Sequence, residues 1–347
     1  MTSPRSNMQY VRLGKSGLKI SRIVLGCMSY GNPNWSGNWV SPKKRPVNIL
    51  RPRDYDAGIN AFDTANAYSN GLSEEILGRA IKEHKLPRDE IVVMTKVFFP
   101  VHKETDKSSF GIPDLDSIGL VNQYGLSRKH IFDSVKNSLR RLDLGYIDLL
   151  QCHRFDYNTP IEETMQALHD VVQQGLVRYV GMSSCFAWQC KSDYAITNNL
   201  TPFISMQNHY NMLYREEERE MFPTLKHFGV GSIPWSSIAR GALSRPLSQQ
   251  SKRSETDLFT ANNYIRTDGN KEIVNRVEEI AKKRGVSMAR VAVAWVLSKD
   301  GVSAPIVGTT SLANLTDIIG AIDVKLTEEE IKSLEEPYTP LPVFGHQ

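Results

Sequence analysis

Residues 147–182, IDLLQCHRFDYNTPIEETMQALHDVVQQGLVRYVGM, contain the strand–helix–strand pattern that decides the fold. Its two ends, 147–152 and 177–182, are short and mostly apolar, as strands buried on both faces are. The middle part predicts a helix over 160–174, which opens with Thr159 and Glu162 as a capping box and Pro160 at the first helical position. We therefore expect two parallel strands joined by a crossover helix.

The same alternation continues along the whole chain. Helical patterns occupy 73–84, 128–142 behind Ser127 as N-cap, 160–174, 215–226, 271–284, 287–298 and 327–336 behind a Thr327–Glu330 capping box. Strand-like runs occupy 23–26, 60–63, 91–95, 147–152, 177–182, 203–207, 229–235 and 304–308. Eight strands alternating with helices predict a (β/α)8 TIM barrel, one domain over residues 1–347. Residues 10–21 predict an N-terminal β-hairpin that turns at 14–17.

The composition is that of an ordinary globular protein, with 40% hydrophobic and 23% charged residues. A scattered net charge of +4 gives no basic stripe, so we expect no nucleic-acid partner. No apolar leader or membrane-length apolar window is present, and we expect a cytoplasmic protein with no membrane partner. Cys27, Cys152, Cys185 and Cys190 lack metal-site spacing, so they predict free thiols rather than a disulfide framework or a metal centre.

Two long polar segments, 99–126 and 244–270, each follow a predicted strand. Long loops in compact domains are often functional, and we expect at least one of them to cover a ligand. Aromatic side chains that either line a substrate pocket or pack the loops are Tyr30, Trp35, Phe98, Phe99 and Phe110.

Ionisable side chains end three consecutive predicted strands. Asp63 ends the second, Lys96 follows the third, His153 follows the fourth, and Tyr68 lies five residues after Asp63. Each alone is typical of a structural ion pair or a packed side chain. Together, at the strand ends where barrel enzymes place their sites, they predict a catalytic group.

The chemistry of these four side chains suggests proton transfer. A free tyrosine has a pKa near 10, and the Lys96 ammonium is expected to lower the pKa of Tyr68. Asp63 would orient Lys96, and His153 would hydrogen-bond a substrate oxygen. None of these groups is a good covalent nucleophile, so we expect Tyr68 to donate a proton.

Longer motifs carry a resemblance to a known family. The runs GINAFDTANAYSNG, VVMTKV, DLLQCHRFD, VRYVGMSS, ISMQNHYN and PWSSIARGAL occur in this order. The chain resembles the aldo-keto reductase superfamily over nearly its whole length. Within it, residues 25–31 and 124–130 are most similar to the fungal aryl-alcohol dehydrogenase and versiconal hemiacetal acetate reductase-like branch.

The resemblance implies an NADP(H)-dependent reductase that converts aldehydes and ketones to alcohols, with Asp63, Tyr68, Lys96 and His153 as its catalytic set. We expect its small-molecule substrates to be aryl or bulky carbonyl compounds. It also implies that Gln207 bonds the nicotinamide amide and that Trp235 stacks on the nicotinamide ring. The full set of expected cofactor contacts is Asp63, Ser183, Ser184, Gln207, Trp235, Ser236, Ile238, Arg240, Gly241, Arg245, Gly308, Thr309, Thr310, Ser311, Asn314 and Asp317.

The chain contains no G-x-G-x-x-G segment, the dinucleotide signature of Rossmann folds. A barrel can instead bind phosphate with the loops after its last two strands. At the position where many members of the family carry a Lys or Arg for the 2′-phosphate of NADPH, this chain has Ser311. At a second position, where family members usually carry an Asn, this chain has Ile318. NADPH remains the expected cofactor, with Arg240, Arg245 or Arg253 supplying charge, and use of NADH stays open.

Three further interpretations follow from the sequence. Pro46 and Pro52 predict a shortened or bent first helix within 41–57, since an internal proline costs about 3 kcal/mol. One alternative function is a cofactor-binding regulatory protein that resembles ion-channel β-subunits. Another is a barrel hydrolase or isomerase that uses Asp63 and His153, which leaves Tyr68 and Lys96 without a role.

Overall fold

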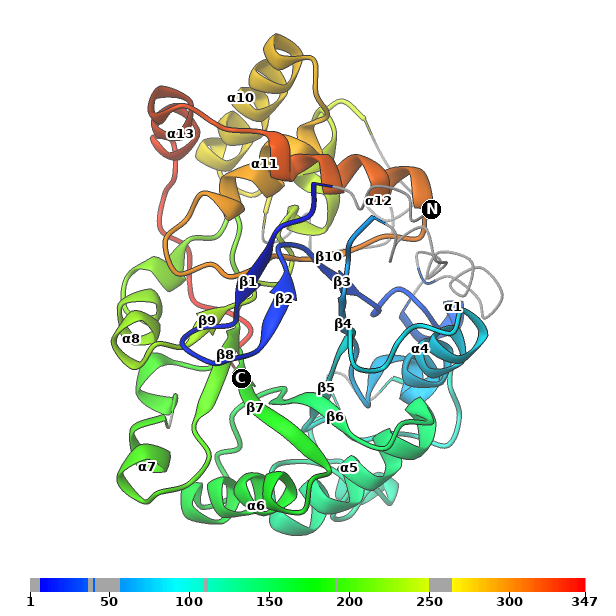
Figure 1. Cartoon of the computed structure of the whole chain (residues 1–347). Helices are drawn as coiled ribbons and strands as arrows, with labels where there is room; N and C mark the ends of the chain where they lie inside the picture. Colours follow the sequence, from blue (N-terminus) through cyan, green and yellow to red (C-terminus); the bar gives the residue numbers. More distant parts are fainter. Residues whose placement is uncertain are drawn as a thin grey trace.

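A computed structural model describes residues 7–36, 40, 57–108, 112–190, 192–249 and 264–346. Its central sheet has eight parallel strands in the order β10-β3-β4-β5-β6-β7-β8-β9. The strands are β3 (Val24–Gly26), β4 (Ala61–Asp63), β5 (Val92–Val97), β6 (Ile147–Cys152), β7 (Val177–Ser183), β8 (Phe203–Gln207), β9 (Gly231–Ser232) and β10 (Ile306–Gly308). They form a ring with helices outside it (Figure 1), which confirms the (β/α)8 barrel.

The ring closes between its last two strands through a few hydrogen bonds. The amides of Ser303 and Ile306 donate to the carbonyls of Ser232 and Pro234, at 2.8 and 2.9 Å. Proline has no N–H, so Pro234 accepts a ladder bond but donates none. This is a physical reason why β9 is only two residues long, where the sequence predicted a strand over 229–235.

Most predicted helices are present on the outside of the barrel. The α-helices are α1 (Pro33–Ser36), α4 (Leu72–Glu83), α5 (Arg128–Leu142), α6 (Ile161–Gln173), α7 (Ser192–Thr197), α8 (Met221–Phe228), α10 (Asp268–Arg284), α11 (Met288–Leu297), α12 (Leu312–Ile319) and α13 (Glu328–Glu335). Ser127 caps α5, and the Thr327–Glu330 capping box opens α13, as predicted.

Two helix predictions were wrong in detail, and three short helices, α1, α7 and α12, were not predicted. The Thr159 hydroxyl donates to Asp156 Oδ2 at 2.6 Å, so it forms no capping box, and Pro160 is the N-cap of α6. The segment 215–226 splits into a 3-10 turn, η4 (Glu216–Glu218), and α8. An uninterrupted helix would place Pro223 in its interior, where proline clashes with the preceding turn.

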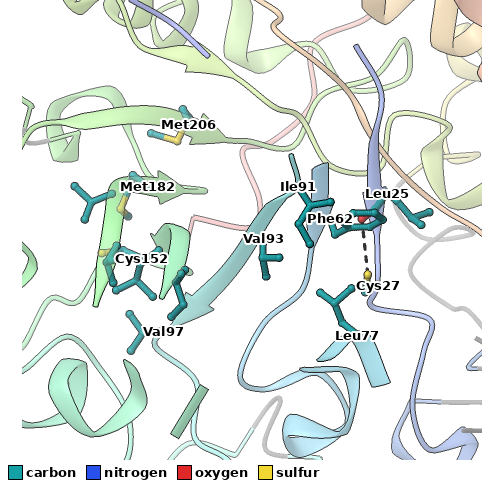
Figure 2. Packing of buried hydrophobic residues seen from close by; sticks show 14 of the residues in the cluster. Leu25, Cys27, Phe62, Leu77, Ile91, Val93, Val97, Cys152, Met182 and Met206 are labelled. Atoms are coloured by element: carbon teal, nitrogen blue, oxygen red, sulfur yellow. Dashed lines mark hydrogen bonds between the residues drawn. The ribbon is translucent and has the colours of Figure 1, made fainter. Parts of the chain in front are cut away.

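Alternation along the strands creates two apolar layers. Val93 of β5 and Phe62 of β4 belong to the larger cluster between sheet and helices, and Figure 2 shows them with Cys152 and Met206. Val92 and Met94 belong instead to a smaller cluster inside the ring. Successive strand side chains point to opposite faces, so every second residue is directed into the barrel.

The predicted hairpin consists of β1 (Tyr10–Arg12) and β2 (Lys19–Ser21), which pair antiparallel. It lies across one end of the ring in Figure 1, and Leu13 and Ile20 join the inner apolar cluster. Its turn approaches the barrel closely, because the Lys15 amide donates to the Gly229 carbonyl at 2.7 Å. The hairpin therefore contributes to the core at this end of the barrel.

All four cysteines are free thiols, as the sequence predicted, and all four are buried. Burial raises the pKa of Cys152 to about 12, with a further contribution from Asp156. The predicted bend within 41–57 falls on residues 41–56, outside the described residues, and so do Phe110, Arg253 and most of the segment 244–270. In the part of the chain that the structure describes, no helix is both long and apolar enough to cross a membrane, and no His, Cys, Asp and Glu group forms a metal site.

We predict that Gly14→Ala destabilises the protein more than Gly285→Ala. Both glycines have a left-handed backbone, with φ of +59° and +64°. A Cβ at Gly14 would lie 2.4 Å from the Gly229 carbonyl oxygen, whereas one at Gly285 meets nothing within 4 Å. We expect costs of about 3 and about 1 kcal/mol in the free energy of unfolding, measured by urea denaturation. Equal costs would contradict the close packing of the hairpin.

Candidate active site

The buried ammonium of Lys96 lies at the centre of the candidate site. Its Nζ atom is 2.6 Å from Asp63 Oδ2, 2.7 Å from the Thr64 carbonyl oxygen and 3.3 Å from the Tyr68 hydroxyl. The Lys96 side chain is 0% exposed and that of Asp63 3% exposed. Three of the four residues predicted from the sequence are therefore in direct contact.

Strand parity explains this convergence. Asp63 is two residues after Ala61 on β4, and Lys96 is two residues after Met94 on β5. Ala61 and Met94 belong to the inner cluster, so Asp63 and Lys96 also point into the barrel, one layer closer to the carboxyl ends of the strands. Two adjacent parallel strands thus place a carboxylate beside an ammonium.

The pKa of Lys96 is raised above its ordinary value. Burial alone would lower this pKa, but the Asp63 carboxylate and the Tyr68 hydroxyl together outweigh it. Lys96 is therefore charged at neutral pH, which is consistent with the expected role of Asp63 in holding it.

The pKa of Tyr68 shifts in the direction opposite to our prediction. Burial raises this pKa more strongly than the Lys96 ammonium lowers it, and the Asp63 carboxylate raises it further. Tyr68 is only 7% exposed, and its ring faces Trp35 at a centroid distance of 6.3 Å. Desolvation of the phenolate is thus the larger effect. Tyr68 is a protonated phenol at neutral pH.

The backbone that carries Tyr68 is unusual. Tyr68 begins a 3-10 segment, η1 (Tyr68–Gly71), in which Ser69 and Asn70 have φ of 47° and 53°. Such left-handed conformations cost about 1–3 kcal/mol each in residues other than glycine. The Asn70 amide nitrogen donates to the Glu104 and Lys107 carbonyls, at 2.8 and 2.6 Å. The beginning of the 99–126 loop therefore holds η1 in this conformation.

His153 lies beside Tyr68, and their ring centroids are 5.7 Å apart in an edge-on arrangement. The His153 amide donates to the Val97 carbonyl at 2.8 Å, which extends the β5–β6 ladder by one residue. Its buried Nδ1 atom has no hydrogen-bond partner among the described residues. Burial, with the nearby Lys96 and Arg154 charges, lowers the pKa of His153 well below its usual value. His153 is therefore a neutral imidazole.

Gln151 is a site residue that the sequence interpretation missed. Asp63 Oδ1 accepts hydrogen bonds from the side-chain nitrogens of Gln151 and Gln207, at 3.0 and 2.8 Å. The Gln207 nitrogen also donates to Gln151 Oε1 at 2.9 Å. The sequence feature that could have identified Gln151 is its position two residues before His153, which places both side chains on the same face of β6. These amides fix the carboxylate that contacts Lys96.

Several expected cofactor residues surround this group. The Ser183 hydroxyl donates to the Gln207 carbonyl at 2.8 Å, and Trp235 Nε1 donates to Ser184 Oγ at 3.0 Å. The Trp235 ring stacks on His209, with centroids 4.2 Å apart and 15° between planes. One stacking partner of Trp235 is thus a histidine that the sequence interpretation did not single out.

The segment after β9 has an irregular backbone. Ser236, Ala239, Arg240 and Gly241 all have positive φ, and residues 239–244 form the 3-10 segment η5 (Ala239–Ser244). Ile238 precedes it, and Arg245 follows it. Two guanidinium groups therefore lie on a segment that follows the carboxyl end of a barrel strand.

The segment after β10 leads through Gly308, Thr309 and Thr310 into α12. Ser311 caps this helix, because its hydroxyl accepts from the Asn314 amide at 3.4 Å. Asp317 bonds the Ser287 hydroxyl and the Arg290 guanidinium, at 2.5 and 2.9 Å. Each of its two carboxylate oxygens therefore already has one partner within the protein.

The aromatic side chains that the sequence assigned either to a substrate pocket or to loop packing fall into two groups. Trp35 faces Tyr68, and Phe99 lies edge-on to His153 at 5.0 Å. Tyr30 is fully buried in the main core, and Phe98 packs against that core. Trp35 and Phe99 therefore border the candidate site, whereas Tyr30 and Phe98 pack the fold.

Comparison with known proteins agrees with this geometry. The family described as the aldo/keto reductase family matches residues 22–338. A Schizosaccharomyces pombe protein, provisionally named an aryl-alcohol dehydrogenase, is 49% identical over 345 residues, which cover 97% of both chains. The versiconal hemiacetal acetate reductase of Aspergillus parasiticus is 45% identical over 342 residues, 96% of this chain and 98% of that protein. A third relative, the aldo-keto reductase AMT2 of Alternaria alternata, is 45% identical over 98% of this chain and 94% of its own.

These matches confirm the resemblance that the sequence motifs indicated, including its fungal branch. They span nearly the whole barrel, together with the strands that bring Asp63, Lys96 and His153 to one end. The chain belongs to the aldo/keto reductase family and is an oxidoreductase of carbonyl compounds.

Proposed function

We propose that this protein reduces aldehydes and ketones, in particular aryl or other bulky carbonyl compounds, to alcohols with NADPH. The observation that carries the proposal is the contact of Lys96 Nζ with both Asp63 Oδ2 and the Tyr68 hydroxyl oxygen, at 2.6 and 3.3 Å. This arrangement supports a protonated tyrosine whose conjugate base would be stabilised by an adjacent cation.

Tyr68 is the proton donor in the proposed reaction. Its oxygen accepts a hydrogen bond from Lys96, so its own hydrogen is available to another acceptor. Bound NADPH supplies the hydride that the carbonyl carbon receives. Tyr68 gives its proton to the carbonyl oxygen, and the ammonium of Lys96 stabilises the phenolate that remains.

Neutral His153 hydrogen-bonds the carbonyl oxygen and sets its direction toward Tyr68. Its position supports this role, because its ring is edge-on to the Tyr68 ring. Asp63, held by Gln151 and Gln207, keeps Lys96 in place. These residues act on orientation and charge, and proton donation itself belongs to Tyr68.

The segments after β9 and β10 suit a dinucleotide phosphate. They combine Arg240 and Arg245, a run of left-handed backbone around Gly241, and the hydroxyls of Thr309 and Ser311. Guanidinium groups and hydroxyls are donors that phosphate oxygens accept. Arg240 and Arg245 would provide the charge that favours NADPH, since Ser311 contributes none.

The aromatic rings of Trp35 and Phe99 support the choice of aryl or bulky carbonyls as substrates. They border Tyr68 and His153 and offer flat apolar surfaces beside the reacting oxygen. The versiconal hemiacetal acetate reductase among the relatives is named for a bulky substrate of its own. Four buried free thiols fit a reducing, cytoplasmic setting.

Replacement of Tyr68 by phenylalanine tests the proton donor. We expect kcat for NADPH oxidation with aryl aldehydes to fall at least about a hundredfold, since general acid catalysis is lost. NADPH affinity, measured by fluorescence titration, should be retained. Tyr10→Phe is the matched control, because Tyr10 lies on the hairpin, where its hydroxyl donates to the Gly58 carbonyl, and its loss should not affect the rate. Equal rates for Tyr68→Phe and wild type would overturn the mechanism, and tight NADPH binding without wild-type turnover would favour the regulatory alternative.

The pH dependence of reduction follows from the two shifted pKa values. Reduction needs protonated Tyr68, whose pKa lies above its ordinary value of 10.0, and neutral His153, whose pKa lies well below 6.5. The rate should therefore stay level as the pH rises from about 7 to about 9, and fall only at higher pH as Tyr68 ionises. The measurement is kcat against pH with one aryl aldehyde. A fall centred near neutral pH would show that Lys96, rather than burial, dominates the pKa of Tyr68.

Cofactor preference is tested with the double variant Arg240→Gln and Arg245→Gln. We expect the KM for NADPH to rise about tenfold or more while the KM for NADH changes little, since only NADPH carries a 2′-phosphate. Steady-state kinetics with each cofactor gives both values. A wild-type protein that turns over NADH more than about tenfold faster than NADPH at saturation would refute the preference.

A further inference from the structure

A cavity of about 500 Å³ lies outside the barrel, between α5 and the loop that follows β5. We call it the α5 cavity. Its wall includes Asn66 and Val101 on one side and Lys129, Ser134 and Arg140 of α5 on the other. It contains none of the four residues proposed for proton transfer, so it is separate from the reductase site.

Asn66 presents an unused acceptor at this cavity. Its side chain is 1% exposed, and its amide nitrogen donates to the Phe99 carbonyl at 3.0 Å and to Ser134 Oγ at 3.3 Å. A backbone carbonyl only accepts, so this contact fixes which end of the Asn66 amide faces Phe99. The remaining Oδ1 atom is buried and has no hydrogen-bond partner among the described residues. Such an atom gains stability from a donor that reaches it.

A second acceptor comes from His130. Its Nδ1 atom is 2.8 Å from the Gly125 carbonyl oxygen and must carry the hydrogen, because that oxygen only accepts. Burial lowers the pKa of His130, so the ring is neutral and Nε2 is an acceptor. Two acceptors in the wall of one cavity favour a ligand with hydroxyl groups.

The cavity also has an excess of positive charge. Lys129, Arg140 and Arg141 line it, against Asp133 as the one acid in its wall. Lys129 pairs with Asp133 at 2.6 Å, and Arg141 pairs with Glu74, also at 2.6 Å. Arg140 donates a long hydrogen bond, 3.4 Å, to Asn137 Oδ1, and none of the ion pairs within the described ranges gives it a carboxylate. An anionic group would give Arg140 the charged partner that the described residues do not provide.

We propose that the α5 cavity binds a small hydroxylated anion, a hydroxycarboxylate or a sugar phosphate. Its anionic group pairs with Arg140, and its hydroxyl groups donate to Asn66 Oδ1 and His130. This binding does not depend on the proposed reductase function.

The site is also connected to the reductase site. The backbone amide of Asn66 donates to the Lys96 carbonyl at 3.3 Å. The side chain of Asn66 bonds the backbone carbonyl of Phe99, and the Phe99 ring contacts the His153 ring. A ligand on Asn66 therefore acts on the same backbone that carries Phe99. If the proposed function is correct, ligand binding in the α5 cavity changes the affinity of the enzyme for the carbonyl substrate, and the substrate changes the affinity for the ligand by the same factor.

The test is calorimetric titration with citrate and, separately, glucose 6-phosphate. NADPH is kept at saturation so that the proposed cofactor site is blocked, and ionic strength is held constant. We expect at least one probe to bind, and Arg140→Gln to weaken it about tenfold or more. Lys136→Gln is the matched control, because Lys136 is an exposed cation on α5 outside the cavity wall and its loss should leave the affinity unchanged.

Asn137→Trp is a second variant, since Asn137 lines the cavity and a large ring there should block both probes. Binding of citrate alone would identify a carboxylate ligand, and binding of glucose 6-phosphate alone a phosphate ligand. No heat from either probe up to about 10 mM would overturn the proposal, and so would equal effects of Arg140→Gln and Lys136→Gln. These measurements need no turnover, so failure of the reductase proposal would remain distinguishable from failure of this one.

Discussion

The fully buried ammonium of Lys96 is the constraint on which the rest of the site depends. Removing an ion from water costs several kcal/mol even after the protein relaxes, so the ammonium needs close partners. Asp63 and the Thr64 carbonyl provide them from the adjacent strand, at 2.6 and 2.7 Å. Loss of Asp63 would leave an uncompensated buried charge. The pairing of β4 with β5 is therefore required for charge balance as well as for the sheet.

The residues that hold the Asp63–Lys96 ion pair come from several parts of the barrel. Gln151 on β6 and Gln207 on β8 both donate to Asp63 Oδ1, the carboxylate oxygen that does not contact Lys96. Strands far apart along the chain therefore hold one carboxylate. Tyr68 reaches Lys96 from a strained segment that Asn70 attaches to the 99–126 loop. Strain of this kind persists only where surrounding contacts determine the conformation. The loop thus positions the tyrosine in addition to bordering the site.

The barrel interior has different chemistry at its two ends. At one end, the hairpin residues Leu13 and Ile20 complete an apolar layer with inward-facing strand residues. Two residues further along the same strands, the inward positions become Asp63, Lys96 and Gln151. The apolar layer and the hairpin support rigid strand ends, and rigid elements hold functional groups more accurately than loops do. The proposed α5 cavity adds a polar surface outside the barrel that shares Asn66 with this end.

The sequence by itself determined the barrel, the order of its strands and the convergence of Asp63, Lys96 and Tyr68, because alternation and strand-end position are local properties of the chain. It also indicated the family, since the motifs that carry the resemblance are contiguous. Only the tertiary structure revealed the roles of Gln151 and His209, because their partners lie on other strands or in distant loops. It also reversed the expected pKa shift of Tyr68. The sign of that shift depends on the balance between desolvation and the field of Lys96, and burial is a property of the packed fold rather than of residue spacing.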